Sequence, residues 1–159
     1  MALAGLSSLG VTFGYGVETT ADTKPTKFNL LTRINAIGGI SGSSNSIDAS
    51  ALEDYMERSV SGRQESGSTF PVTINMTPDT VQEWNKVISD YKALTGGKRM
   101  WFEVCHPQMD GKAFFIVGQP PQVIPMPSFD QNALMTVELT IAIDEYKGLD
   151  TEVKPTAAS

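Results

Sequence analysis

Alternating hydrophobic and polar residues are the main feature of the chain after residue 26. The clearest case is Leu134–Ile143, in which nearly every second residue is a large apolar one. Between them lie polar positions that include Thr136, Glu138 and Thr140. A period of two is typical of a β-strand with one buried face and one face in water. By the same criterion, strands are predicted over Phe28–Ile40, Thr69–Met76, Met100–His106 and Lys112–Gly118.

One segment has the period of a helix instead. Thr77 suits an N-cap and Pro78 suits the first helical position. Gly96-Gly97 is typical of a helix end. We therefore predict one α-helix over about residues 78–95, lying on a sheet by a single apolar stripe. The residues of that stripe are Val81, Trp84, Ile88, Tyr91 and Leu94.

The remaining segments lack a strong period. Residues 1–25 are rich in Gly, Ser and Thr, with weak β character over Val11–Val17, and are predicted to form an N-terminal arm with few contacts of its own. Residues 41–67 are predicted to be a long loop, with a short helical turn over Ala51–Met56. The prolines of 120–127 indicate an edge or irregular strand. After Gly148, residues 148–159 are predicted to be a flexible tail.

These elements define a mainly β fold. The 159 residues suit a single domain, 1–159, with a core of its own. We expect an antiparallel β-sandwich or open barrel of six to eight strands, with one helix packed on it.

Charge narrows the class of partners. The formal net charge is −6, and the excess of acidic residues lies in 48–65 and 138–154. Tight nucleic-acid binding depends on neutralising phosphates with Lys and Arg, so this balance argues against it. No run approaches the roughly 20 apolar residues of a membrane helix, and the first ten residues lack the basic region of a signal peptide. We expect a soluble protein made in a cytoplasm.

Candidate chemistry is sparse. Cys105 and His106 are the only cysteine and the only histidine. As strand neighbours they would point to opposite faces, which disfavours a catalytic dyad. Zinc needs more ligands of this kind, and no glycine-rich phosphate loop is present. We therefore expect no catalytic, cofactor or metal site, and no enzyme. Trp84 lies on the apolar helix stripe, whereas Trp101 could be core or a stacking platform.

Two stretches carry a resemblance to a known family. Residues 46–54 contain the turn Ile47-Asp48-Ala49-Ser50 and then acidic residues, and Gly62–Gly67 leads into the predicted strand at Thr69. Near the end, Gly111–Phe115 is followed by a proline-containing link and the alternating strand. In this order, over about residues 26–147, the elements resemble those of bacteriophage tail tube proteins, the major tail proteins of long-tailed phages.

The resemblance implies a structural subunit that forms stacked, hexameric rings around a channel for DNA. It implies that residues 41–67, with arms at about 1–20 and 148–159, bridge adjacent rings, and that Phe28–Ile40 and Leu134–Ile143 build the barrel wall. The candidate residues of the inter-ring loop are Ile47, Asp48, Leu52, Glu53, Asp54, Glu57, Arg58, Arg63 and Glu65. The candidate channel-lining residues are Thr136, Glu138 and Thr140.

The same resemblance implies that the partners are other copies of the chain and the tape-measure, tail-tip and tail terminator proteins. DNA would pass without tight binding, and the protein would reside in the virion tail after synthesis in the host cytoplasm. Two alternatives remain. One is an inner-tube subunit of a contractile injection or secretion system. The other is a carbohydrate-binding β-sandwich that uses Trp101 and nearby aromatic residues as its platform.

Overall fold

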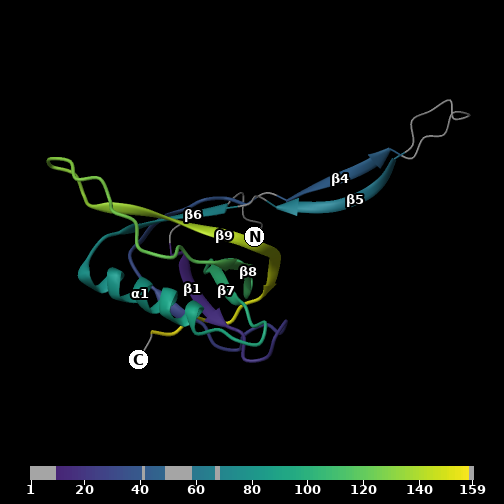
Figure 1. Cartoon of the computed structure of the whole chain (residues 1–159), viewed down its shortest axis with the longest axis horizontal. Helices are drawn as coiled ribbons and strands as arrows, with labels where there is room; N and C mark the ends of the chain where they lie inside the picture. The colour runs from purple at the N-terminus through teal and green to yellow at the C-terminus, as the bar shows by residue number, and fades with distance from the viewer. Residues whose placement is uncertain (1–9, 41, 49–58, 67–68, 158–159) are drawn as a thin grey trace, which may run out of the picture.

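The computed structural model describes residues 10–40, 42–48, 59–66 and 69–157. Within these ranges the chain forms strands and one helix, which form a compact body with a hairpin projecting from it (Figure 1). Their bounds are β1 Thr12–Val17, β2 Asn29–Leu31, β3 Ile34–Ile37, β4 Gly42–Asp48, β5 Ser59–Ser66, β6 Thr69–Asn75, α1 Pro78–Lys92, β7 Met100–Cys105, β8 Lys112–Gln119 and β9 Thr136–Thr151.

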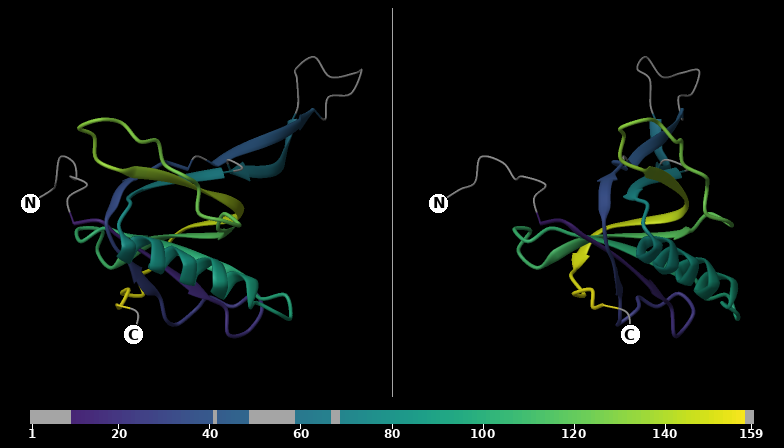
Figure 2. Two further views of the ribbon diagram at one scale, coloured as in Figure 1. Left: turned by 60° about the vertical axis from the view of Figure 1, so that its left-hand side comes forward. Right: turned by 90° about the vertical axis from the view of Figure 1, so that its left-hand side faces the viewer.

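Seven strands form one antiparallel sheet in the order β2-β1-β7-β8-β9-β6-β3. β2 and β3 occupy opposite edges, although only Thr32 and Arg33 separate them in sequence. Two residues span roughly 11 Å at most, so the edges must approach each other and the sheet must curl (Figure 2). The prediction of a mainly β fold with one packed helix is confirmed, and the curled sheet is best described as an open barrel.

The prediction of one long strand over Phe28–Ile40 is wrong. Arg33 has φ 57°, a left-handed conformation that breaks the strand and redirects the chain from one edge of the sheet to the other. Alternation in the sequence continues across this break, although Ile34 and Ile37 of β3 are only partly buried.

The core lies inside the curl, with α1 laid across it. Trp84 of α1 is fully buried and stacks on Phe13 of β1, with 6.4 Å between ring centroids. Phe102, Leu139 and Ile141 belong to the same cluster. A smaller cluster lies on the other face of β7 and β8: Phe28, Trp101, Cys105, Ala113, Phe115 and Val117.

The helix begins as predicted. The Thr77 hydroxyl accepts a hydrogen bond from the Thr80 backbone N–H at 3.2 Å, and Pro78 is the first helical residue. The helix ends at Lys92, somewhat before the predicted residue 95, and Gly96 and Gly97 follow with positive φ. Val87 is also buried on the side of α1 that faces the sheet, although it was not among the residues predicted for the apolar stripe.

The prediction of an arm with few contacts is wrong for Thr12–Val17. The weak β character noted there corresponds to β1, which lies between β2 and β7 in the sheet. Its glycines were interpreted as a sign of flexibility, but they allow close strand packing. A Cβ on Gly14 would lie 2.9 Å from the Asn29 carbonyl oxygen, and a Cβ on Gly16 would lie 2.7 Å from that of Lys27.

The C-terminal tail was also predicted wrongly. β9 continues through Gly148, which has φ 75°, and pairs with β8 as far as Thr151. The Leu30 N–H then donates to the Thr156 carbonyl at 2.7 Å, and Val153 packs on the smaller cluster. Residues 149–156 therefore belong to the folded body.

The predicted loop at 41–67 is a two-stranded antiparallel sheet where it is described. β4 pairs with β5, with Gly42 opposite Ser66 and Asp48 opposite Ser59. This hairpin continues the β3–β6 pair outward and projects from the body (Figures 1 and 2). The helical turn predicted over 51–56 lies outside the described residues.

Candidate assembly surfaces

The outer face of β6 and β9 is polar and nearly free of charge. Glu138 and Thr140 are exposed and Thr136 is partly exposed, whereas Val137, Leu139 and Ile141 between them are buried. Across the ladder, Asn75, Thr73 and Pro71 of β6 oppose Thr136, Glu138 and Thr140. The three channel-lining candidates thus share one outward face, as their alternation predicted, and Glu138 carries the single charge among these six.

The two edges of the curled sheet differ. The outer edge of β2 is covered by the C-terminal segment, because the Thr156 N–H donates to the Phe28 carbonyl at 3.0 Å and the Leu30 N–H donates to the Thr156 carbonyl. On β3, by contrast, the described residues place β6 on one side and no strand on the other. An uncovered edge offers unpaired backbone groups to another chain.

The hairpin carries the described candidates of the inter-ring loop. Ile47 and Asp48 end β4, opposite Val60 and Ser59, and Glu65 of β5 lies opposite Ser43. Arg63 lies in β5 near the register shift. The remaining candidates, Leu52, Glu53, Asp54, Glu57 and Arg58, lie outside the described residues.

The segment between β8 and β9 is a surface that the sequence analysis missed. It forms an irregular loop that projects at the end of the body away from the β4–β5 hairpin (Figure 1). Large apolar side chains are exposed on it, namely Val123, Met126, Phe129 and Leu134. Its prolines were interpreted only as strand breakers, although the lack of charge between residues 113 and 129 was a usable signal of a contact surface.

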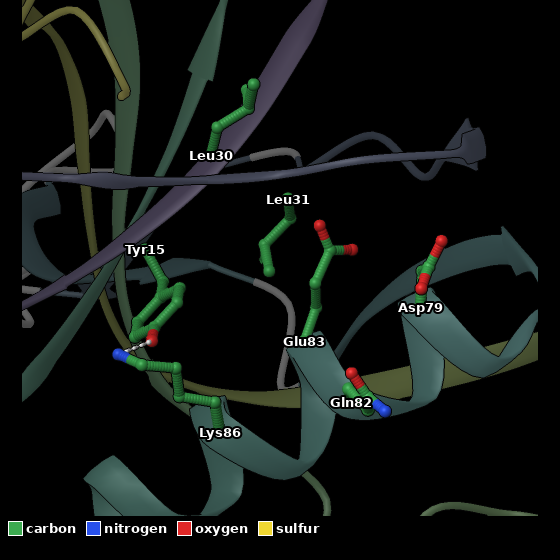
Figure 3. A pocket seen from close by; sticks show the side chains of 7 residues that line it. All are labelled: Tyr15, Leu30, Leu31, Asp79, Gln82, Glu83 and Lys86. Carbon is green, nitrogen blue, oxygen red and sulfur yellow. Dashed lines mark hydrogen bonds between the residues drawn. The ribbon is translucent and has the colours of Figure 1, made fainter. Parts of the chain in front are cut away.

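A pocket of about 330 Å³ lies where α1 faces β1 and β2 (Figure 3). Two of its three charged residues, Glu83 and Lys86, are already engaged. Glu83 accepts a 2.9 Å hydrogen bond from the Thr32 hydroxyl, and Lys86 lies 3.4 Å from both the Tyr15 hydroxyl and an Asp90 oxygen. Burial and the bond to Asp90 raise the pKa of Tyr15. These contacts fasten the helix to the sheet.

The residues with catalytic potential have structural roles. Cys105 is buried in the smaller cluster, and burial, followed by the nearby Glu103, raises the pKa of its thiol. His106 accepts a 3.1 Å hydrogen bond at Nδ1 from the Gln108 backbone N–H. Among the described residues, no cluster of His, Cys, Asp or Glu side chains is suited to a metal ion. In the same part of the chain, no helix has the length and hydrophobicity needed to cross a membrane.

Trp101 is a core residue. Its side chain is buried, and its Nε1–H donates to a carboxylate oxygen of Glu18 at 3.2 Å. The ring of Phe115 meets it edge-on. The carbohydrate-binding alternative relied on Trp101 as an exposed platform, and its burial contradicts that use.

Comparison with known proteins rests on structure. No family model matches the sequence, and no curated protein matches it. A chain in the tail of an empty gene transfer agent particle, solved with C6 symmetry, matches with a TM-score of 0.57 and 15% identity, over 93% of this chain and 99% of that one. A chain of the virion of the native gene transfer agent particle matches with a TM-score of 0.52, 15% identity and the same coverage.

A chain of the anti-feeding prophage baseplate, six-fold symmetrised, matches with a TM-score of 0.52 and 12% identity, over 97% of this chain and 99% of that one. Because these identities are low, the likeness concerns the fold. The chain has a fold found in tail and baseplate proteins of phage-like particles. The resemblance to tail tube proteins is thus confirmed at the level of the fold.

Proposed function

We propose that the chain is a structural, non-enzymatic subunit of a phage-like tail tube, and that its copies form stacked six-membered rings around a channel for DNA. The observation that carries the proposal is the β3 edge of a curled sheet, beside which the described residues place no strand, whereas the C-terminal segment covers the other edge. The fold shared with chains of six-fold symmetric tail and baseplate assemblies supports it.

The open edge gives a physical reason to assemble. Strand edges in stable monomers are usually short, charged or covered. Here β3 holds Asn35 and Ala36, both exposed, and no charged residue. A copy that pairs with this edge would repeat the contact at its own β3, and such a head-to-tail interface closes into a ring at a suitable rotation.

The outer face of β6 and β9 suits a channel wall in this assembly. We assign Thr136, Glu138 and Thr140 to the lining. Hydroxyl groups and an isolated carboxylate would let DNA slide, because a wall rich in Lys or Arg would bind its phosphates.

The β4–β5 hairpin suits contacts between rings, since it projects well beyond the body that would form one ring (Figure 1). We assign its described candidates Ile47, Asp48, Arg63 and Glu65 to that contact. Tape-measure, tail-tip and terminator proteins would meet the tube inside and at its ends, and the protein would reside in the virion tail.

Electron microscopy of the purified protein tests this proposal. Negatively stained wild-type protein should show rings or hollow filaments at high concentration. The variant Ala36→Lys, which places a charge beside the open edge, should stay monomeric with an unchanged circular dichroism spectrum. Gln82→Lys adds the same charge on the exposed face of α1 and should still assemble. Dispersed wild-type monomers at every concentration would refute the proposal.

The second candidate function is an inner-tube subunit of a contractile injection system. The structural match to a chain of the anti-feeding prophage baseplate favours it. Both candidate functions require the same ring. They differ in what passes through the channel and in whether a contractile sheath surrounds the tube. Particles that contain this chain inside a contractile sheath and carry no DNA would favour the second candidate.

A further inference from the structure

The curled sheet has an apolar groove beside its open edge. The groove has a volume of about 990 Å³, and none of the described residues that line it is charged. One wall is the β3 edge and the residues after it, with Ile37 and Ile40 partly buried. The other wall is made by Val104, Phe114 and Tyr146, which face the inside of the curl. A groove of this composition favours an uncharged, apolar occupant.

The exposed loop between β8 and β9 has the matching chemistry. Pro120 and Pro127 are buried and Ile124 packs on the main core cluster, so the loop is anchored at three points. Between these anchors it presents Val123 and Met126, which are 73% and 82% exposed. Proline-rich segments of this kind lose little conformational freedom on binding. Because neither residues 120–127 of the loop nor the groove lining carry a charge, contact between them would carry no cost of burying an ion.

The loop runs along the β6–β9 pair: it leaves β8 at Gln119, which pairs with Ala142 opposite Thr69, and only its far end, at Thr136, lies at the end of these strands away from the groove. β9 starts beside the loop at Thr136, which pairs with Asn75, and its partner β6 reaches the groove near Phe70. About five residues of strand separate these points, or roughly 17 Å. Residues 120–135 are absent from the groove lining of their own chain. One contact between two copies would therefore cover both surfaces.

We propose that the groove beside β3 receives the β8–β9 loop of a second copy of this chain, with Val123 and Met126 as the inserted side chains. The proposal deepens the proposed function, on which it rests, because the groove adjoins the open edge where a neighbouring copy would pair. The contact is heterologous, so it can repeat around a ring or along a stack.

Disulfide trapping tests the contact. One sample carries Gly39→Cys, whose added Cβ would meet no atom within 4 Å, and a second carries Met126→Cys. The native Cys105 is buried and should not compete. After the two full-length variants are mixed and mildly oxidised, we expect a covalent dimer in at least tenfold excess over a mixture of Met126→Cys with Lys92→Cys, a control thiol on the exposed side of α1.

The outcomes separate this inference from the proposed function. Rings that form while the Gly39→Cys and Met126→Cys variants give no covalent dimer would overturn the loop-in-groove contact and leave the tube proposal intact. Failure of the wild type to assemble would overturn both. The alternative occupant is residues 1–9 of the same chain, which precede Gly10 at the groove. A dimer that appears only after removal of residues 1–9 would assign the groove to that segment and overturn the proposal.

A charged substitution in the loop provides a second test of the contact between the loop and the groove. Met126→Asp should lower the assembled fraction at least tenfold while the monomer melts at an unchanged temperature, because Met126 makes little contact within its own chain. Gln122→Asp, also in the exposed part of the loop, is the matched control and should assemble more than Met126→Asp. Equal assembly of Met126→Asp and the wild type would contradict the proposal.

Discussion

At the scale of single residues, Glu18 shows how this fold accommodates a buried charge. Its carboxylate accepts hydrogen bonds from the Arg99 backbone N–H at 2.6 Å and from Trp101 Nε1 at 3.2 Å. The Arg99 guanidinium lies 3.5 Å away. The paired charge thus fixes the start of β7 to the segment that follows β1.

Glu18→Ala should lower the free energy of unfolding by about 2–4 kcal/mol, because the Trp101 and Arg99 donors would remain buried without a partner. Urea denaturation measures the change. Asp22→Ala is the matched control, since Asp22 also pairs with Arg99 but is largely exposed. The Asp22→Ala substitution should lower the free energy of unfolding much less than Glu18→Ala does. Equal losses for the two variants would contradict this role of Glu18.

Glu103 should make stability depend on pH. Its side chain is buried and accepts a hydrogen bond from the Val153 N–H at 2.9 Å. Burial raises the pKa of Glu103 above its usual 4.5, although the Val153 N–H and the Cys105 thiol oppose this shift. The protonated form is therefore favoured by folding. Its contribution to stability is complete below pH 4.5 and is lost as the pH rises through the raised pKa.

Glu103→Gln keeps an acceptor for Val153 and removes the titration. The free energy of unfolding of the wild type, relative to this variant, should therefore fall as the pH rises from about 4 toward neutrality. Chemical denaturation across this range measures it. Parallel curves for the two proteins would show that Glu103 does not contribute.

At the scale of elements, the pairing of β3 with β6 depends on one glycine. A Cβ on Gly38 would lie 2.4 Å from Pro71 Cγ, and the Gly38 N–H donates to the Pro71 carbonyl at 2.9 Å. Gly38→Ala should destabilise the fold by about 1–3 kcal/mol, because the rigid proline ring cannot move aside freely. Thermal unfolding measures the loss.

The adjacent Gly39→Ala is the control for this clash. Its Cβ would lie in open space, so stability should stay the same or rise slightly. A loss in Gly39→Ala as large as that in Gly38→Ala would mean that backbone freedom in this turn matters, and not the contact with Pro71.

The sequence predicted the elements whose periodicity is strong and local. The β9 alternation placed Glu138 and Thr140 opposite the buried Leu139, and Thr77 and Pro78 marked the start of α1. It could not predict that β1 lies within the sheet, because Gly14 and Gly16 suit close packing and flexible segments equally well.

Local sequence patterns could not predict features that depend on contacts between segments far apart in the chain. The break at Arg33 depends on the two sheet edges approaching each other, and the strand after Gly148 depends on pairing with β8. The exposed apolar loop was missed because proline was considered only for the hydrogen bonds that it removes. The partial exposure of the groove walls follows from the curl, which no single segment encodes.

At the scale of the whole molecule, the charge of the proposed channel face should govern the passage of DNA. Glu138 is exposed and lies opposite Thr73 on that face. Glu138→Lys should leave assembly intact and slow DNA ejection, because one added positive charge from every copy in the ring would attract phosphates. Ejection kinetics of reconstituted particles measure the effect.

Particles built from the control variant Glu138→Gln, which adds no positive charge, should eject DNA at nearly the wild-type rate. Intact tails built from the Glu138→Lys variant that eject DNA normally would contradict the lining assignment.

The central claim is that the open edge of β3 pairs with a strand of another copy of the chain. Hydrogen–deuterium exchange of the β3 amides, compared between dilute and assembled wild-type protein, tests this directly. We expect amides within Ile34–Ile37 that exchange rapidly in the dilute protein to become protected on assembly, while exchange in α1 stays unchanged. Assembly without added protection of β3, or exchange that is the same at every concentration, would contradict the account.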